Sequence, residues 1–178
     1  MGRVSIRKSW KLLKIRYTII LFIVALTFIL SYLAPNYLQQ TTIELSDISL
    51  IYYLWFWIFA IQVIVFIPSF IFKTEHYYDL TGGITYISTI IIALILKISY
   101  QSIDLISLLI GSMVIIWAAR LSLFLFLRVK KSGEDIRFKK IKHSFSWFLM
   151  TFMLQGMWVF MCLFPALVVI SSYNSEIN

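Results

Sequence analysis

Residues 105–129 read LISLLIGSMVIIWAARLSLFLFLRV, an apolar stretch whose interior carries one charge, Arg120, and which runs into a dense basic loop. About 20 consecutive apolar residues are enough to cross a bilayer as a helix, so this stretch predicts a transmembrane span. An arginine at membrane depth is costly unless it finds a partner or reaches the interface. Arg120 therefore marks either a packed polar contact or a working site.

The composition extends this prediction to the whole chain. Apolar residues make up 61% of the 178 residues and charged residues 13%, against roughly 45–50% and about 25% in soluble domains. Short connections favour a single all-α polytopic transmembrane helix bundle. We expect one transmembrane domain over residues 17–172, between a basic N-terminal segment, 1–16, and a polar tail, 173–178. Its five predicted spans are residues 17–33, 48–72, 80–97, 105–129 and 147–170.

The net charge of +8 is unevenly distributed. All Lys and Arg residues except Lys97 and Arg120 lie in residues 1–16, at Lys73 or in residues 128–142, which five spans place on one side. The positive-inside rule then puts the N-terminus on the cytoplasmic or matrix-type side and the C-terminus opposite. The charge indicates topology and contact with anionic membrane lipids rather than nucleic acid. The mitochondrial inner membrane, the endoplasmic reticulum and the bacterial inner membrane all fit this pattern.

The sequence lacks the motifs of several common kinds of enzyme and binding site. The chain has no Gly-rich dinucleotide fingerprint between a strand and a helix, no phosphate-binding loop and no nucleophile elbow. His76 and His143 have no spacing that builds a metal site with carboxylates, so no metal is expected. The single cysteine, Cys162, forms no disulfide within the chain.

Polar residues inside the predicted spans are the remaining candidates. Arg120 lies eight residues before Arg128, which places it about 12 Å deeper along a helix. Gln155 and Trp158 share one stripe of the fifth span, and Gln62 is isolated in the second. These residues either make interhelical hydrogen bonds, each worth about 1 kcal/mol, or line a site. Both interpretations stay open.

Acidic residues in the loops on the basic side form a second group. The topology brings them near arginines, so ion pairs are possible. Asp79 precedes the third span, where a carboxylate also caps the backbone amides of a helix N-terminus. We expect capping there, with arginine pairing as the alternative. The acidic residues are Glu75, Asp79, Glu134 and Asp135, and the arginines are Arg120, Arg128 and Arg137.

Three segments together resemble the uncharacterised membrane relatives of steroid 5-alpha-reductase. They are residues 73–86 (KTEHYYDLTGGITY), 117–137 (WAARLSLFLFLRVKKSGEDIR) and 152–165 (FMLQGMWVFMCLFP), and the resemblance covers roughly residues 70–172. It implies an all-helical bundle, usually of six or seven spans. Characterised members use NADPH to reduce an activated carbon–carbon double bond in a steroid or other lipid-like substrate.

The resemblance also implies which residues form the site. Arg120, Arg128, Asp135 and Arg137 correspond to the cofactor side, where arginines meet phosphate charge through bidentate hydrogen bonds. Interior polar or substrate positions are Asp79, Gln155 and Trp158. The family's C-terminal segment, which carries an arginine, a histidine and an asparagine–tyrosine pair, has no counterpart in this sequence.

Two functions follow as expectations. The first is a non-catalytic structural or accessory subunit that packs against other membrane-protein subunits and binds no cofactor if the chain ends at Asn178. The second is an NADPH-dependent membrane reductase that acts on a carbon–carbon double bond of a lipid-like substrate. Fold resemblance alone does not transfer an activity, so the site must decide between them.

Overall fold

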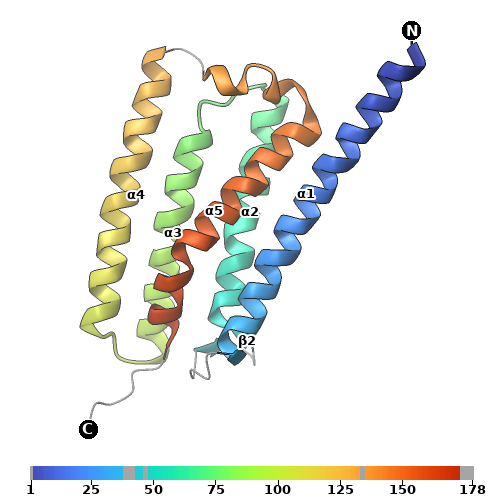
Figure 1. The fold of residues 1–178 in the computed structure, drawn as a ribbon. Coiled ribbons are helices and arrows are strands. Elements are labelled where there is room, and N and C mark those ends of the chain that lie inside the picture. Colours follow the sequence, from blue (N-terminus) through green and yellow to red (C-terminus); the bar gives the residue numbers. More distant parts are fainter. Residues whose placement is uncertain (1, 38–42, 46–47, 133–134, 173–178) are drawn as a thin grey trace.

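The computed structural model describes residues 2–37, 43–45, 48–132 and 135–172. Five long helices form one bundle (Figure 1): α1 (Gly2–Tyr37), α2 (Leu50–Ile71), α3 (Tyr78–Tyr100), α4 (Leu105–Ser132) and α5 (Phe145–Ser171). Each is long and apolar enough to cross a membrane, and their exposed apolar side chains contact lipid. The prediction of a five-span, all-helical membrane protein is confirmed. The polar tail predicted for residues 173–178 lies outside the described residues.

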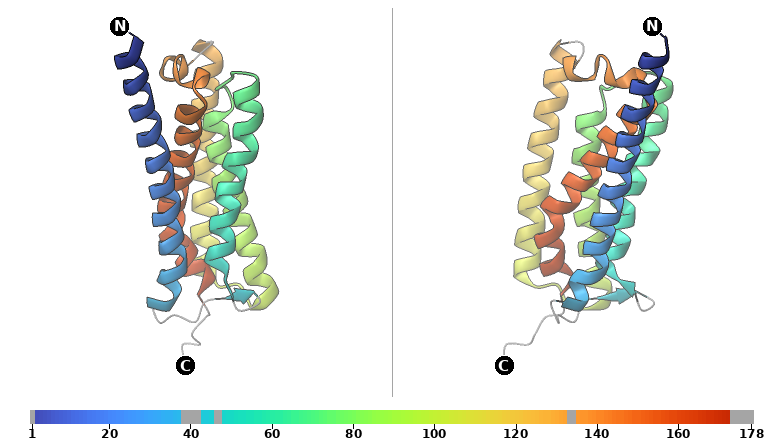
Figure 2. Two further views of the ribbon diagram at one scale, coloured as in Figure 1. Left: turned by 90° about the vertical axis from the view of Figure 1, so that its right-hand side faces the viewer. Right: turned by 45° about the vertical axis from the view of Figure 1, so that its right-hand side comes forward.

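The ends of the bundle agree with the predicted topology. The α1 helix begins at the same end as the connection between α4 and α5, and α5 ends at the opposite end, as the views of Figure 2 show. The basic connection contains two short 3-10 helices, η1 (Ile136–Phe138) and η2 (Ile141–His143). We call this end the basic end and the other end the distal end.

A small hairpin at the distal end modifies one predicted boundary. Strands β1 (Glu44–Leu45) and β2 (Ile48–Ser49) pair antiparallel, so α2 begins at Leu50 and not at Ile48. The Ser49 hydroxyl caps α2 by accepting a hydrogen bond from the Ile51 amide at 3.3 Å. The hydrophobic pattern did not distinguish strand from helix over these residues, because two residues are too few to show the period of either.

Helix α5 holds the bundle together because it contacts each of the other four helices. Its buried face packs Phe148, Phe152 and Leu163 against α2 and α3, where Phe66 and Ile90 are also buried. Polar side chains inside the bundle join neighbouring helices. Gln62 of α2 donates to the Thr85 hydroxyl of α3 at 3.2 Å, which is an interhelical hydrogen bond of the expected kind, while its Oε1 has no partner among the described residues.

A buried ion pair fixes the distal end. Lys97 of α3 is only 1% exposed, and its ammonium lies 2.7 Å from the Asp104 carboxylate. It also donates to the Ser107 hydroxyl at 2.9 Å and to the Ser172 carbonyl at 3.3 Å. From the sequence, Lys97 indicated only the topology. The close spacing of Lys97 and Asp104 across a short α3–α4 turn was the available signal.

Candidate functional site

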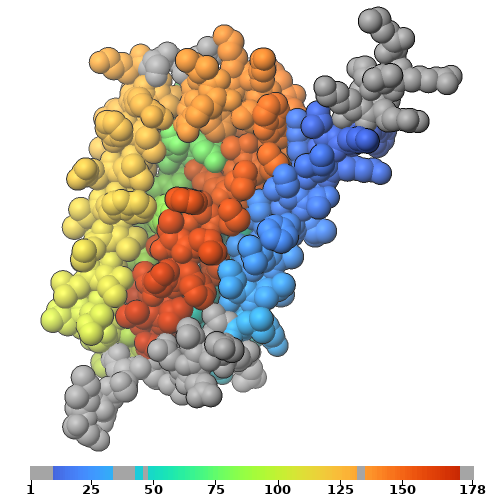
Figure 3. Space-filling view, viewed as in Figure 1, coloured from blue at the N-terminus to red at the C-terminus, as the bar shows by residue number. Residues whose placement is uncertain are grey.

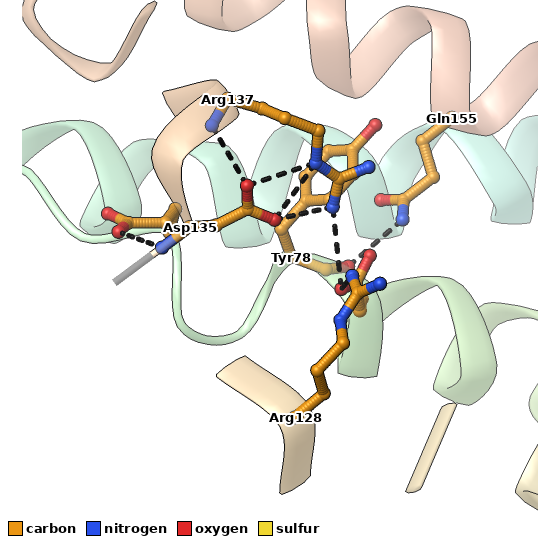
Figure 4. Close-up of polar contacts among 7 residues, drawn as sticks. Tyr78, Arg128, Asp135, Arg137 and Gln155 are labelled. Carbon is orange, nitrogen blue, oxygen red and sulfur yellow. Dashed lines mark hydrogen bonds and ion pairs between the residues drawn. The ribbon is translucent and has the colours of Figure 1, made fainter. Parts of the chain in front are cut away.

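Asp79, in the first turn of α3, lies between two arginines at the basic end (Figure 4). Its carboxylate is 4.0 Å from Arg128 of α4 and 3.9 Å from Arg137 of η1. The N-cap of α3 is Tyr77, which makes no capping hydrogen bond with its side chain. The arginine pairing considered as an alternative for Asp79 is therefore present. It joins the start of α3 to the end of α4 and to η1, which follows α4.

Asp135 fixes the guanidinium of Arg137. The Arg137 Nε donates to both carboxylate oxygens of Asp135 at 3.0 Å, and its backbone amide donates to Oδ1 at the same distance. The hydrogen bonds from Arg137 hold the pKa of Asp135 below its ordinary value, and Asp135 in turn raises the pKa of Arg137. Both groups therefore stay charged at neutral pH. Arg137 remains 60% exposed and can still meet a ligand.

Glu75 holds the basic connection in place through its buried carboxylate. It is 4% exposed, accepts from the Lys142 ammonium at 2.8 Å and accepts from the Asp135 amide at 3.3 Å. Burial raises the pKa of Glu75, but Lys142 and the Asp135 amide outweigh burial and lower it overall. A charged Glu75 thus ties η1 and η2 to the α2–α3 turn, and this positions Arg137.

Gln155 connects α5 to the first turn of α3, close to the arginines. Its Nε2 donates to the Tyr78 carbonyl at 2.9 Å (Figure 4). The Tyr78 hydroxyl donates to the Thr151 carbonyl at 3.0 Å, so α3 and α5 are joined twice. The close approach depends on Gly82, because a Cβ atom there would lie 2.8 Å from the Gln155 Nε2.

A pocket of about 190 Å³ lies below this network, between α3, α4 and α5. Figure 3 shows that face of the molecule, where α3 is visible at the bottom of a hollow between α4 and α5. The walls are largely apolar, and Asp79 lies at the basic end of the lining. The lining also includes Gly82, Tyr86, Trp117, Leu121, Gln155 and Trp158.

Two buried polar atoms of residues that line this pocket have no hydrogen-bond partner among the described residues. They are the Tyr86 hydroxyl, which has only the weakly hydrogen-bonding Cys162 thiol beside it, and the Gln155 Oε1. The Gln155 orientation follows from its Nε2, which the Tyr78 carbonyl occupies. Buried polar groups are normally satisfied, so such pairs point to a ligand or water. Tyr86, which lies on the same face of α3 as Gly82 and Gly83, was not among the predicted site residues.

The structure divides the predicted site residues into two groups. Asp79, Arg128, Asp135, Arg137 and Gln155 belong to one network, and Trp158 lines the pocket beneath it. Arg120 does not join them. It lies on the exposed side of α4, in a surface groove with Trp117, Leu121 and Phe124. Glu134, another suggested partner for the arginines, lies outside the described residues.

The arrangement can hold an amphipathic molecule. The exposed guanidinium groups at the basic end attract an anionic group, and the apolar walls take an apolar group. The unpaired hydroxyl of Tyr86 can donate to a ligand oxygen, and the unpaired Gln155 oxygen can accept from a hydroxyl or amide. Within the described ranges, no group of three or more His, Cys, Asp or Glu side chains is placed to hold a metal ion.

Comparison with known proteins gives one match. A family model described as a protein of unknown function, DUF1295, matches residues 65–178, which contain the whole pocket and both arginines. No curated protein and no solved structure matches the chain.

Proposed function

Because the chain belongs to the DUF1295 family, whose matched region contains the pocket and its arginines, we propose a ligand-binding function for that region. The proposed activity is an NADPH-dependent reduction of a carbon–carbon double bond in a steroid or other lipid-like substrate. The support for this activity is the resemblance of three segments to relatives of steroid 5-alpha-reductase, namely residues 73–86, 117–137 and 152–165.

One observation carries the proposal. Two guanidinium groups, those of Arg128 and Arg137, meet at the basic end of an apolar pocket whose lining residues include two unpaired buried polar atoms. A purely structural polar network tends to satisfy its own groups, because an unpaired buried polar atom costs about 1–3 kcal/mol. The unpaired atoms of Tyr86 and Gln155 are better explained by a ligand that offers an oxygen to one and a donor to the other.

The residues present fit part of NADPH. Arg128 and Arg137 would hold phosphate charge, and the exposed side chains of Lys130, Lys131 and Lys140 add positive charge around them. A volume of about 190 Å³ admits one ring system or a short lipid segment, not a complete dinucleotide. When bound, NADPH supplies the hydride. We therefore assign to the pocket only the reacting end of the bound molecules.

The chain's own residues would bind and orient the substrate. The Tyr86 hydroxyl would donate to a substrate carbonyl, which polarises a conjugated double bond, and Gln155 would fix the substrate through its Oε1. The apolar walls from α3, α4 and α5 would exclude water from the reacting carbons. The basic end faces the cytoplasm or its equivalent, the side from which a soluble nucleotide would arrive.

Binding is the first test. The protein is purified in detergent, and energy transfer from its tryptophans to reduced nicotinamide is followed during titration with NADPH. We expect saturable binding that weakens at least about tenfold when Arg128 and Arg137 are both replaced by Leu, since each charge-assisted hydrogen bond contributes about 1.5–3 kcal/mol. The double variant Lys11→Leu, Lys14→Leu, which removes two exposed charges from α1 and none from the residues around the arginines, is the matched control. Absence of saturable binding, or equal binding by the double variant, rules the proposal out.

Turnover is the second test. The protein is reconstituted with NADPH and a 4-ene-3-ketosteroid, and the saturated product is measured by mass spectrometry. Product that depends on the protein and is reduced by Tyr86→Phe supports the reductase. Binding without product from a range of lipid enones would leave ligand binding intact and refute the reductase.

An accessory subunit of a membrane complex is the second candidate. The observation that favours it is the outer face of α4, which exposes Arg120 at membrane depth among aromatic side chains. Purification in a mild detergent tests this function. A stable complex of defined composition that contains no nucleotide favours it, and a monodisperse single chain argues against it.

A further inference from the structure

Arg120 lies on the outer face of α4, apart from the network around Asp79. Its side chain is exposed, and none of the residues described in the structure gives it a hydrogen bond or an ion pair. Glu75, Asp79, Asp104 and Asp135, the described carboxylates with cationic partners, are bonded to other residues. A charged arginine facing hydrocarbon without a partner is costly. The structure thus leaves this cation unpaired where lipid or another protein must cover it.

Arg120 is too deep to reach the basic end easily. It precedes Arg128 by eight residues, which corresponds to about 12 Å along the helix. Helical side chains lean toward the N-terminus of their helix, and the α4 N-terminus is at the distal end. Snorkelling toward the basic end therefore works against the direction of the side chain. A phospholipid headgroup at the interface is poorly placed to pair with Arg120.

The surroundings of Arg120 have the form of a helix-binding face. Trp117, Arg120, Leu121 and Phe124 line a surface groove of about 420 Å³ on α4. Exposed residues continue along the helix at spacings of three and four, which is the pattern by which one helix packs on another. The stripe consists of Met113, Ile116, Trp117, Arg120, Phe124 and Leu127.

We propose that this face of α4 binds a transmembrane helix that carries an Asp or Glu side chain at the depth of Arg120. The carboxylate pairs with the guanidinium, and apolar residues of the partner fill the groove beside Trp117 and Phe124. A second copy of the described chain does not meet this requirement, because its carboxylates lie at the two ends of the bundle. Arg120 lines this groove and not the pocket, although Trp117 and Leu121 line both.

The test uses defined peptides. The protein, labelled with a fluorescent donor at its N-terminus, is reconstituted in phosphatidylcholine vesicles with acceptor-labelled polyleucine peptides of about 22 residues, long enough to span the bilayer. Three peptides differ only at one central position, which is Glu, Gln or Leu. We expect the Glu peptide to bind about five- to thirtyfold more tightly than the Leu peptide, with Gln between them.

Two variants locate the effect. Arg120→Leu should abolish the preference for Glu, and Lys131→Leu, which removes a charge from the end of the same helix, should retain it. Thermal unfolding of both variants checks that the bundle is intact. Equal binding of all three peptides, or a preference that survives Arg120→Leu, overturns the proposal. If Arg120 instead immobilises spin-labelled phosphatidylglycerol while the peptides bind equally, the occupant is a lipid and the helix proposal is wrong.

Discussion

Gly82 and Gln155 lie so close together that a methyl group at position 82 would collide with the Gln155 side chain. A Cβ atom at position 82 would lie 2.8 Å from the Gln155 Nε2, the atom that donates to the Tyr78 carbonyl. The colliding group is the end of a flexible side chain, which can move aside. The glycine therefore protects the position of Gln155 in the pocket more than it protects the stability of the bundle.

Gly82→Ala is predicted to separate stability from binding. We expect the free energy of unfolding to change little, because an overpacking cost of about 1 kcal/mol at a flexible contact is offset by the roughly 1 kcal/mol that Ala gains over Gly inside a helix. Ligand binding should weaken much more, because the Gln155 amide must leave the Tyr78 carbonyl. Thermal unfolding in detergent and NADPH titration measure the two effects. Unchanged NADPH affinity would show that Gln155 does not position the ligand.

Gly83→Ala, at the next residue, is predicted to affect stability more than Gly82→Ala does. Its Cβ atom would lie 2.2 Å from the Ser122 Cβ, an atom fixed to the α4 backbone. The helices must therefore separate, and we expect the free energy of unfolding to fall by about 3 kcal/mol. Adding Ser122→Gly removes the obstructing atoms and should recover most of the loss, after subtraction of about 1 kcal/mol for glycine in a helix. No recovery in the double variant would place the strain elsewhere.

Tyr86→Phe is predicted to stabilise the ligand-free protein while it impairs function. The Tyr86 hydroxyl is buried with only the Cys162 thiol, a weak hydrogen-bonding group, beside it, so its removal should raise the free energy of unfolding by up to about 1 kcal/mol. If the hydroxyl donates to a substrate carbonyl, substrate affinity or turnover falls in the same variant. A thermal melt and an activity assay read the two effects. A destabilised Tyr86→Phe protein would mean that the hydroxyl has a structural partner.

The distal ion pair predicts unequal effects of two substitutions. Asp104→Asn leaves the buried Lys97 ammonium without its counterion and should cost about 3 kcal/mol. Lys97→Met removes the buried charge itself and leaves Asp104, which is 28% exposed, with access to water. We expect that variant to lose clearly less. Unfolding free energies of the two variants provide the comparison, and equal losses would contradict a burial cost centred on Lys97.

Acid should release the basic connection before it unfolds the bundle. The pKa of Glu75 is below its ordinary value of 4.5 and that of Asp135 is below 3.8, so their stabilisation is complete above these values. It is lost as the pH falls through the lowered pKa values, because the folded state must then release its bonds to Lys142 and Arg137. Hydrogen exchange of residues 135–144 should increase below about pH 4.5. Glu75→Gln should show faster exchange already at neutral pH.

The ion pair at the distal end should be lost at a lower pH than the bonds of the basic connection. Burial raises the pKa of Asp104, but bonds from Lys97 and Ser107 lower it to about 2. The ion pair is therefore retained down to this range and weakens only as the pH falls from 3.8 toward 2. Loosening of the basic connection should precede loosening of the distal end.

The sequence was sufficient for the bundle, because span length and hydropathy predicted the five helices. The resemblance pointed to Asp79, Arg128, Asp135, Arg137, Gln155 and Trp158, which lie in the network at the basic end or in the pocket beneath it. Their part in binding stays a prediction. The sequence did not show that Arg120 faces away from the bundle, because the hydropathy of a span does not determine how its helix is rotated about its own axis. The hairpin before Leu50 and the unpaired hydroxyl of Tyr86 also required three-dimensional packing.

The place of α5 in the chain has a consequence for biosynthesis. The pocket needs walls from α3, α4 and α5, and Arg137 reaches Asp79 only when the connection leading into α5 is in place. Because α3 and α4 precede α5 in the chain, they are synthesised first, when Asp79 already has Arg128 of α4 beside it but the glycine face of α3 has no α5 to cover it. During that interval the nascent protein has a half-built site open to lipid. An insertase or chaperone that shields intramembrane polar groups would act at this stage of synthesis.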